Sequence, residues 1–520
     1  MPGSMKPPRS NSGEAFAWAE RVASTWFLDD GGTDRMAFDG LEVGPTMRIE
    51  AFDSMLDLTR RAGGDSHAPG HRIFRSLKRG GFDRAARTWA LRAVAGVHRG
   101  RTERASGQAP WKGAKVLFVS ELSTPSTLEP SMLVAKALPQ ESFAVATADP
   151  RSHLAWRTAG QHPQPLMLSM TEERRILARA SSSARGAWEA FARDPPAFDL
   201  GGSDVTPDVL RALRPLVMRS VPWLAVERHA LERTLGSVAP SCVVVATDQH
   251  RIGRLAATLR SGSDWRLVVL QHGLPQDAIG FVPVVADAVA VWSPSSTKWF
   301  VSHGTDPARL VETGNPRMDP LVRSDRSAVG GTTAAGVGLV GRPRLLLALS
   351  GLSSAASVAA TRLAVDSLSR MPEATLIIKL HPGGGDWLPI RRIAKGTEDK
   401  VKSRVRVIDR ARLDSLLPWA DLVLVHRSSV AVEALAAGTP VAIADVGGGS
   451  IADLELAALD LPRVATGSDV ATIAHQLADE NERRGYLAAR RRELELIAGP
   501  LDGRSASRTA ALLLGADHPA

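Results

Sequence analysis

LVLVHRSSVAVEALAAGTPV, residues 422–441, is the segment that predicts the fold class most clearly. An apolar run is followed by a polar turn, a helical pattern and a glycine, and a second apolar run, TPVAIAD, covers residues 439–445. Neither run alternates with polar residues, so both faces of each strand should be buried, as in a parallel sheet covered by helices on both sides. The stretch therefore predicts a strand, helix, strand unit.

Similar apolar runs recur in both halves of the chain. The second half also contains PRLLLALS (343–350), ATLIIKLHP (374–382), RVRVID (404–409) and ADLVLVH (420–426). The first half contains AKVLFVS (114–120), FAVATAD (143–149), PSCVVVATD (240–248), WRLVVLQHG (265–273), DAVAVWS (287–293) and ARLVETGNP (308–316), with a helical block near 171–236. We therefore predict an α/β protein with two doubly wound, parallel-sheet, Rossmann-like domains.

Three parts are expected along the chain. Residues 1–110 carry apolar residues at helical spacing, which predicts a helical N-terminal extension. Its basic amphipathic segments either lie on anionic lipid or pack on the next domain. Residues 111–325 and 340–500 are the two Rossmann-like domains, and the stretch 324–342 between them is rich in Gly, Ser, Thr and Ala, as linkers are. Two sheets joined in this way should face a cleft.

Composition limits the class of protein. The 520 residues are 23% charged and 44% hydrophobic, as expected for globular domains, and the net charge of +9 favours acidic partners such as nucleotide phosphates or anionic lipid. Cys242 is the only cysteine, which excludes an intrachain disulfide. No apolar run reaches the roughly 18 residues that a membrane span needs. We expect a cytoplasmic protein, with peripheral contact at the inner face of the membrane left open, and no nucleic-acid partner, because aromatic stacking platforms are missing.

Polar residues follow several predicted strands, where open parallel sheets bind their ligands. In the second half, His381 and Gly383 follow one strand, and Arg427, Ser428 and Ser429 follow another. Glycines allow a close approach to phosphate, and hydroxyls with helix amides can hold a diphosphate. Glu433 should share a helix face with the serines, within reach of a ribose.

The segments HP, LLPWADLVLVHRSS and EALAAGTPV together resemble the donor-binding half of GT-B glycosyltransferases. They are most similar to bacterial surface-polysaccharide enzymes of the sialyltransferase and Kdo-transferase types, and to CDP-glycerol glycerophosphotransferases. LQHG and GNPRMDPL in the first half are similar to segments of the glycerophosphotransferases. The resemblance covers roughly residues 114–480. It implies an acceptor domain over 111–325 and a nucleotide-sugar donor domain over 340–500.

The resemblance also implies roles for individual residues. His381, Ser428 and Ser429 would bind the donor's phosphates, Glu433 the ribose or base, and Asn315 and Arg317 would line the cleft, with Asp319 structural. His272 would be the general base that takes a proton from an acceptor hydroxyl, because its ordinary pKa lies near working pH. Asp248 and Glu121, which also follow strands of the first half, compete for that role, since carboxylate bases are common in inverting enzymes of this architecture.

The expected activity is transfer of a sugar from a nucleotide-sugar to a surface-polysaccharide or glycolipid acceptor, as in capsule or cell-envelope synthesis. No DxD-like motif follows a strand, so we expect no metal and no cofactor beyond the nucleotide-sugar co-substrate. Three alternatives stay open: a CDP-alditol-type phosphotransferase, an enzyme like the UDP-sugar 2-epimerases, and a non-catalytic partner that binds nucleotide or glycan.

Overall fold

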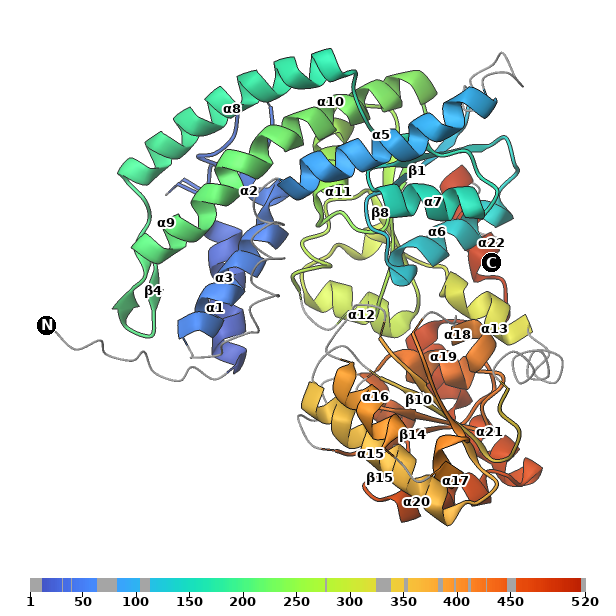
Figure 1. Ribbon diagram of the computed structural model, residues 1–520. Helices are drawn as coiled ribbons and strands as arrows, with labels where there is room; N and C mark the ends of the chain where they lie inside the picture. The colour runs from blue at the N-terminus through green and yellow to red at the C-terminus, as the bar shows by residue number, and fades with distance from the viewer. Residues whose placement is uncertain are drawn as a thin grey trace, which may run out of the picture. The chain divides into compact units, whose positions relative to one another are not determined.

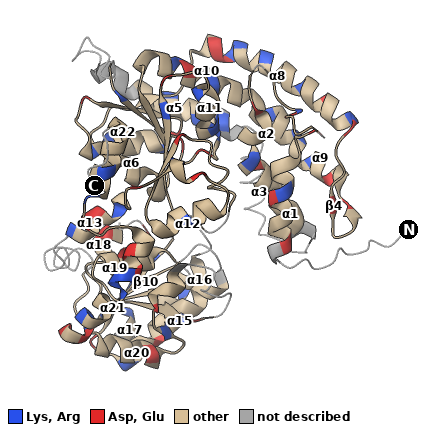
Figure 2. Cartoon of the chain, turned by 180° about the vertical axis from the view of Figure 1, so that it is seen from behind, with Lys and Arg blue, Asp and Glu red and all other residues tan. Residues whose placement is uncertain are grey.

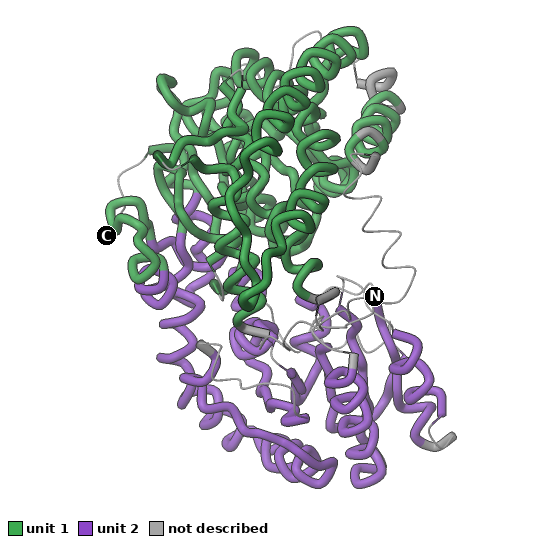
Figure 3. The backbone as a smooth tube through the Cα atoms, turned by 90° about the vertical axis from the view of Figure 1, so that its left-hand side faces the viewer, with its two compact units in different colours: residues 1–290, 300–311, 510–520 green, residues 291–299, 312–509 purple. Residues whose placement is uncertain are grey.

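The structure, a computed structural model, contains two parallel β-sheets and many helices (Figure 1). It describes residues 12–29, 31–38, 40–62, 82–102, 113–275, 278–323, 338–349, 354–381, 387–396, 399–409, 413–426, 428–446 and 455–515. The chain forms two compact units (Figure 3). Unit 1 comprises residues 1–290, 300–311 and 510–520, and unit 2 comprises residues 291–299 and 312–509. The predicted domain limits and the predicted cleft stay predictions.

The first sheet has seven strands in the order β3-β2-β1-β6-β7-β8-β9. They are β1 (Val116–Ser120), β2 (Phe143–Thr147), β3 (Gln164–Pro165), β6 (Cys242–Val245), β7 (Arg266–Leu270), β8 (Ala288–Val291) and β9 (Leu310–Glu312). The pairs from β3 to β8 are parallel, and β1, β2 and β6 are buried throughout, as their unbroken apolar runs predict. All six apolar runs predicted as strands in this half contain one.

Helices follow most strands of the first sheet. They are α6 (Pro125–Ala137), α7 (Pro150–Thr158), α8 (Met170–Arg193), α9 (Thr206–Pro215), α10 (Val221–Val238), α11 (Arg251–Arg260) and α12 (Pro294–Ser302). The predicted helical block contains α8, α9 and α10, with α8 and α10 side by side (Figure 1). A π-helical turn, η1 (Leu216–Ser220), and a two-stranded hairpin of β4 (Asp199–Leu200) and β5 (Ser203–Asp204) were not predicted.

The described part of the N-terminal region is mainly helical, as predicted. It contains α1 (Ser12–Thr25), α2 (Val43–Thr46), α3 (Arg48–Ala62) and α5 (Phe82–Thr102). Helix α1 packs on α3, α3 on α9, and α5 on α7. On α5, Arg84 forms an ion pair with Glu50, and Arg92 forms one with Glu173. The charges of these two arginines are therefore paired within unit 1. This supports the packing alternative for the basic helix, and contact with lipid stays a prediction.

The second sheet has six strands in the order β12-β11-β10-β13-β14-β15, and every neighbouring pair is parallel. They are β10 (Arg344–Ala348), β11 (Thr375–Lys379), β12 (Val405–Ile408), β13 (Leu422–Val425), β14 (Val441–Ala444) and β15 (Arg463–Val464). All five predicted strands of this half are present. The two-residue strand β15 was not predicted.

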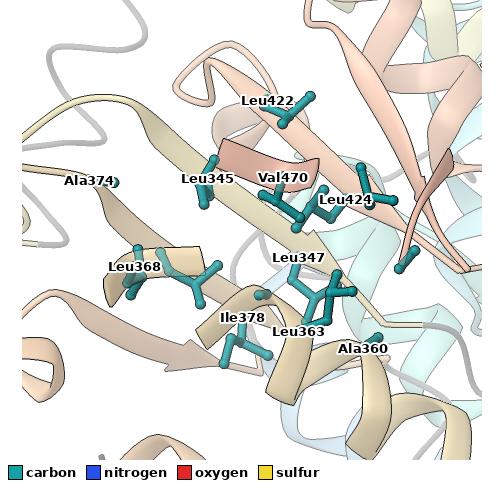
Figure 4. Close-up of a cluster of buried hydrophobic side chains, with 14 of the residues drawn as sticks. Leu345, Leu347, Ala360, Leu363, Leu368, Ala374, Ile378, Leu422, Leu424 and Val470 are labelled. Atoms are coloured by element: carbon teal, nitrogen blue, oxygen red, sulfur yellow. The ribbon is translucent and has the colours of Figure 1, made fainter. Parts of the chain in front are cut away.

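The core of unit 2 lies between this sheet and its helices. Leu345 and Leu347 of β10, Ile378 of β11 and Leu424 of β13 are fully buried, and Leu363 of α15 packs with them (Figure 4). The helices and short turns are η3 (Pro316–Met318), α13 (Asp319–Arg323), α15 (Ser354–Arg370), α16 (Leu388–Lys395), α17 (Asp399–Lys402), α18 (Leu413–Leu416), α19 (Val430–Ala436), η5 (Glu455–Leu459), α20 (Gly467–Gln476), α21 (Glu480–Ala498) and the first half of α22 (Ser505–Leu514).

Candidate functional site

The strand order defines where unit 2 can bind a ligand. From β10 the chain proceeds outward through β11 and β12, and it then returns to β13 on the other side of β10. The connections that leave β10 and β13 therefore diverge, and ligands of open parallel sheets bind at such a switch point. His381 follows β11, and Ser428 and Ser429 follow β13, so the structure brings these three predicted residues to the carboxyl edge on both sides of β10.

The two serines differ in what their hydroxyls bind. Ser428 is half-buried, and its Oγ accepts a hydrogen bond of 3.3 Å from the N–H of Val430, the first residue of α19. Ser429 occupies the N-cap position of α19, but its side chain makes no capping hydrogen bond and is exposed. Its hydroxyl can therefore be used for a ligand without loss of a helix cap.

His381 lies beside a lysine that the sequence analysis overlooked. Lys379 is the last residue of β11, and its buried ammonium donates to the carbonyls of Leu380 (2.8 Å) and Asp409 (3.0 Å). Burial, and then the charge of Lys379, lower the pKa of His381 below its ordinary value, so its imidazole is neutral at pH 7. The signal was present in the sequence, because Lys379 interrupts the apolar run ATLIIKLHP.

Glu433 and Arg317 form an ion pair in unit 2. The carboxylate of Glu433, on α19, lies 2.9 Å from Nη1 of Arg317, and both side chains are largely buried. Asn315 accepts the backbone N–H of Arg317 at 3.1 Å, while its buried Nδ2 has no hydrogen-bond partner among the described residues. The Asn315–Arg317 turn thus belongs to the unit that contains the serines, although its sequence position placed it at the end of the first half.

Two other predictions in this half have different outcomes. Asp319 is structural, as expected, because its two carboxylate oxygens accept the N–H groups of Ser505 (3.0 Å) and Ala506 (2.8 Å) at the start of α22. Gly383 and Arg427 lie outside the described residues, so their donor-binding roles stay predictions.

The first sheet has its own switch point, between β1 and β6. Glu121 lies directly after β1 and lines a small pocket there, together with residues of α6 and the start of α11. Its Oε2 accepts the N–H of Ile252 at 2.7 Å, and its Oε1 lies 3.7 Å from Nη1 of Arg251. Glu121 is thus held at the N-terminus of α11, where a negative charge is stabilised by the helix.

Both carboxylate oxygens of Asp248 accept hydrogen bonds from other groups of the chain. One carboxylate oxygen accepts the N–H groups of Val285 (2.7 Å) and Ala286 (2.9 Å), and the other accepts the side-chain amide of Gln249 (2.8 Å). Asp248 is also 2% exposed. These contacts favour a structural role for Asp248, in which it holds the loop before β8. They count against Asp248 as the general base, because both of its oxygens already accept hydrogen bonds.

His272 lies directly after Gln271, at the carboxyl end of β7, and lines a second small pocket with Asp248 and Phe281. Its ring stacks on Phe281 with centroids 4.9 Å apart, and its Nδ1 lies 3.0 Å from the carbonyl of Ala246. An N–H at Nδ1 donates to this carbonyl, which leaves the lone pair on Nε2. Burial, and then the neighbouring His250, lower the pKa of His272 to about 4, although the bond to Ala246 opposes the shift.

Among the described residues, no group of three or more His, Cys, Asp or Glu side chains is arranged to hold a metal ion. Within the same ranges, no helix is long and apolar enough to cross a membrane.

No protein-family model and no curated protein matches the chain. Solved structures are similar to it at low identity. HepE of Anabaena in complex with UDP and glucose is 16% identical, with 77% of this chain and 99% of that chain covered and a TM-score of 0.49. A UDP-GlcNAc 2-epimerase from Neisseria meningitidis bound to UDP-GlcNAc is 12% identical over 77% and 99% of the two chains (TM-score 0.49). A glycosyltransferase from Rickettsia africae is 10% identical over 78% and 99% (TM-score 0.45).

The chain's own sheets define its class. Both are doubly wound, both have an internal switch point, and the sequence-predicted polar residues gather at the carboxyl edge of each. The predicted fold class, an α/β fold with two doubly wound, Rossmann-like parallel sheets, is confirmed.

Proposed function

We propose that the chain is a glycosyltransferase that uses a nucleotide-sugar, and that the second sheet binds the donor's diphosphate. The observation that carries this proposal is the position of Ser429. Its hydroxyl is exposed at the edge next to the switch point and does not cap its own helix, while Ser428 binds the first turn in its place. A phosphate oxygen is a suitable acceptor for such a hydroxyl.

His381 and the Arg317–Glu433 pair complete the proposed donor site. A neutral His381 can donate an N–H to a phosphate oxygen without carrying charge. Glu433 lies on α19, the helix that follows the serines, and its carboxylate lies 2.9 Å from Nη1 of Arg317. The proposed site therefore contains a cation next to the carboxylate proposed to bind the ribose. We propose that these groups hold the donor without a metal ion or a further cofactor.

His272 and Glu121 are the two proposed candidates for the general base on the acceptor side, with Asp248 third. His272 has a lone pair on Nε2 and, with a pKa near 4, is unprotonated at working pH, but it is then a weak base. Glu121 has one carboxylate oxygen without a hydrogen-bond partner among the described residues, and that residue lines the switch-point pocket. We propose a polysaccharide or glycolipid acceptor, and an enzyme that works in the cytoplasm at the inner face of the membrane.

The donor site is tested by thermal unfolding with CMP, CDP, UDP, GDP and dTDP in the presence of EDTA. One nucleotide should raise the melting temperature, because a ligand that binds only the folded state stabilises it in proportion to its saturation. Ser429→Ala should reduce that shift and leave the melting temperature of the free protein unchanged. Ser369→Ala, an exposed serine near the end of α15, is the matched control and should keep the full shift.

Absence of any shift in the wild type would contradict the nucleotide site. An equal shift in Ser429→Ala would remove this serine from it. Incubation with nucleotide-sugars that contain the stabilising nucleotide, with no acceptor added, then distinguishes the reaction types. An epimerase converts its substrate without an acceptor, and a transferase does not.

A further inference from the structure

The first sheet has a switch point like that of the second, but its helix terminus is already occupied. In such folds the N-terminus of the helix after the strand binds phosphate through its backbone amides. Here the N–H of Ile252, in the first turn of α11, donates to Oε2 of Glu121 at 2.7 Å. A Cβ at Gly253 would lie 2.1 Å from the carbonyl oxygen of Thr247, so the helix start is packed tightly against the end of β6.

The second carboxylate oxygen of Glu121, Oε1, indicates a ligand other than phosphate. The side chain of Glu121 is 7% exposed, and its buried Oε1 has no hydrogen-bond partner within the described ranges. A buried oxygen left without a donor costs free energy, and a hydroxyl is the group that relieves this cost without adding charge. Glu121 lines the pocket with Ser120, Thr127 and Thr247, whose side chains are hydroxyls.

A buried ion cluster holds the Glu121 carboxylate in place. Arg251 contacts Glu121 at 3.7 Å, Glu50 at 3.4 Å and Glu227 at 3.1 Å, and Arg84 contacts Glu50 at 3.3 Å. Burial lowers the pKa of Arg251, but Glu227, Glu121 and Glu50 outweigh it and raise that pKa well above its ordinary value. Arg251 therefore stays cationic at every working pH.

The N-terminal helices supply part of this cluster. Glu50 lies on α3 and Arg84 on α5, whereas Glu227 lies on α10 and Arg251 begins α11. Figure 2 shows basic segments on α11, near α2, which contacts it. The N-terminal region is thus part of the electrostatic setting of the pocket, because Glu50 of α3 and Arg84 of α5 belong to the same ion cluster as Glu121.

We infer that the switch-point pocket of the first sheet binds a hydroxyl group of an uncharged sugar and excludes phosphate, with Glu121 Oε1 as the hydrogen-bond acceptor. This rests on the proposed function, because it names the acceptor of that reaction: a neutral glycan end in place of a phosphorylated one. An incoming phosphate would meet a carboxylate where other nucleotide-fold proteins present a free amide.

Saturation-transfer difference NMR tests this with methyl glucoside and methyl N-acetylglucosaminide, and with glucose 6-phosphate and N-acetylglucosamine 6-phosphate as charged counterparts. The wild type should bind a neutral probe and neither phosphate. Glu121→Gln, which keeps the shape of the side chain, should weaken binding of the neutral probe about tenfold, as expected for loss of a charge-assisted hydrogen bond. Glu189→Gln, an exposed residue of α8, is the matched control and should bind as the wild type does.

A second variant tests the exclusion of anions. Glu121→Ala releases the amide of Ile252 beside Arg251, so inorganic phosphate should broaden in its ³¹P spectrum more with this variant than with the wild type. Failure of both neutral probes to bind, binding of the phosphorylated sugars by the wild type, or equal phosphate binding by wild type and variant would each overturn the proposal. Nucleotide stabilisation measured on the same proteins reports the second sheet separately, so failure there would count against the donor site alone.

Discussion

At the scale of single residues, His272 should make the stability of the protein depend on pH. Its pKa is about 4 in the folded state and near 6.5 in the unfolded chain, so the unfolded state binds more protons between these values. Stability is then fully present above pH 6.5 and is lost as pH falls toward 4. The midpoint of thermal unfolding should therefore decrease between pH 7 and pH 5, and His272→Gln should reduce this decrease.

His162, an exposed histidine, provides the control for that measurement. His162→Gln is the matched variant and should leave the pH dependence unchanged. If His272→Gln shows the wild-type decrease, the imidazole is not the group that titrates. Turnover measured on the same variant ranks His272 against Glu121 as the base.

The Arg317–Glu433 pair leads to a second prediction at this scale. Glu433→Ala leaves a largely buried guanidinium without its carboxylate and should lower the free energy of unfolding by up to about 3 kcal/mol. Replacing both partners, as in Arg317→Met with Glu433→Leu, should recover part of that loss. Urea unfolding measures both, and the exposed pair of Arg211 and Asp208 supplies a comparison in which Asp208→Ala should cost less than about 1 kcal/mol.

The sequence could indicate these residues but not their partners. His272, Glu121 and Ser429 were found because they follow apolar runs, and the carboxyl end of a strand is a local property of the sequence. The contact of Glu433 with Arg317 could not be predicted, because it depends on which segments the fold brings together. The same holds for Asp248, whose competing bonds to Val285 and Ala286 come from another loop.

At the scale of elements, strand prediction succeeded where burial dominates and failed where it does not. Runs such as LLLA in β10 are apolar on both faces, which favours a buried strand of a parallel sheet. The strands β3 and β15 contain two residues each and are held by one neighbour at the edge of a sheet, so they leave no periodic pattern. The strand order was not predictable from single runs either, because it is set by how the crossover helices pack.

Asp319 gives a prediction for one element, helix α22. Its buried carboxylate binds the amides of Ser505 and Ala506, which would otherwise lack partners at the start of the helix. Asp319→Ala should therefore destabilise unit 2 by about 2 kcal/mol. Asp479 caps α21 with two similar bonds at an exposed position, and Asp479→Ala should cost roughly half as much. Equal costs in urea unfolding would show that burial of the Asp319 cap adds nothing.

At the scale of the whole molecule, two sheets with the same kind of switch point present different groups at their carboxyl edges. In unit 2 the edge presents serine hydroxyls, a neutral histidine and the Arg317–Glu433 ion pair, and Lys379 ends β11 two residues before that histidine. In unit 1 the corresponding edge presents the Glu121 carboxylate beside Arg251, which also contacts Glu50 and Glu227. Because charge decides whether a helix terminus accepts phosphate, the two sheets should divide the ligands between them.

Hydrogen–deuterium exchange measures that division directly. Saturating nucleotide should slow exchange around residues 379–381 and 428–436 of unit 2, since bound ligand restricts the backbone at the edge it contacts. Residues 121–122 and 246–253 of unit 1 should exchange at the same rate with and without nucleotide, and Ser429→Ala should remove most of the effect in unit 2. Protection by nucleotide at residues 246–253 would contradict the assignment, because it would require an anion beside Glu121, where the carboxylate already holds the amide of Ile252.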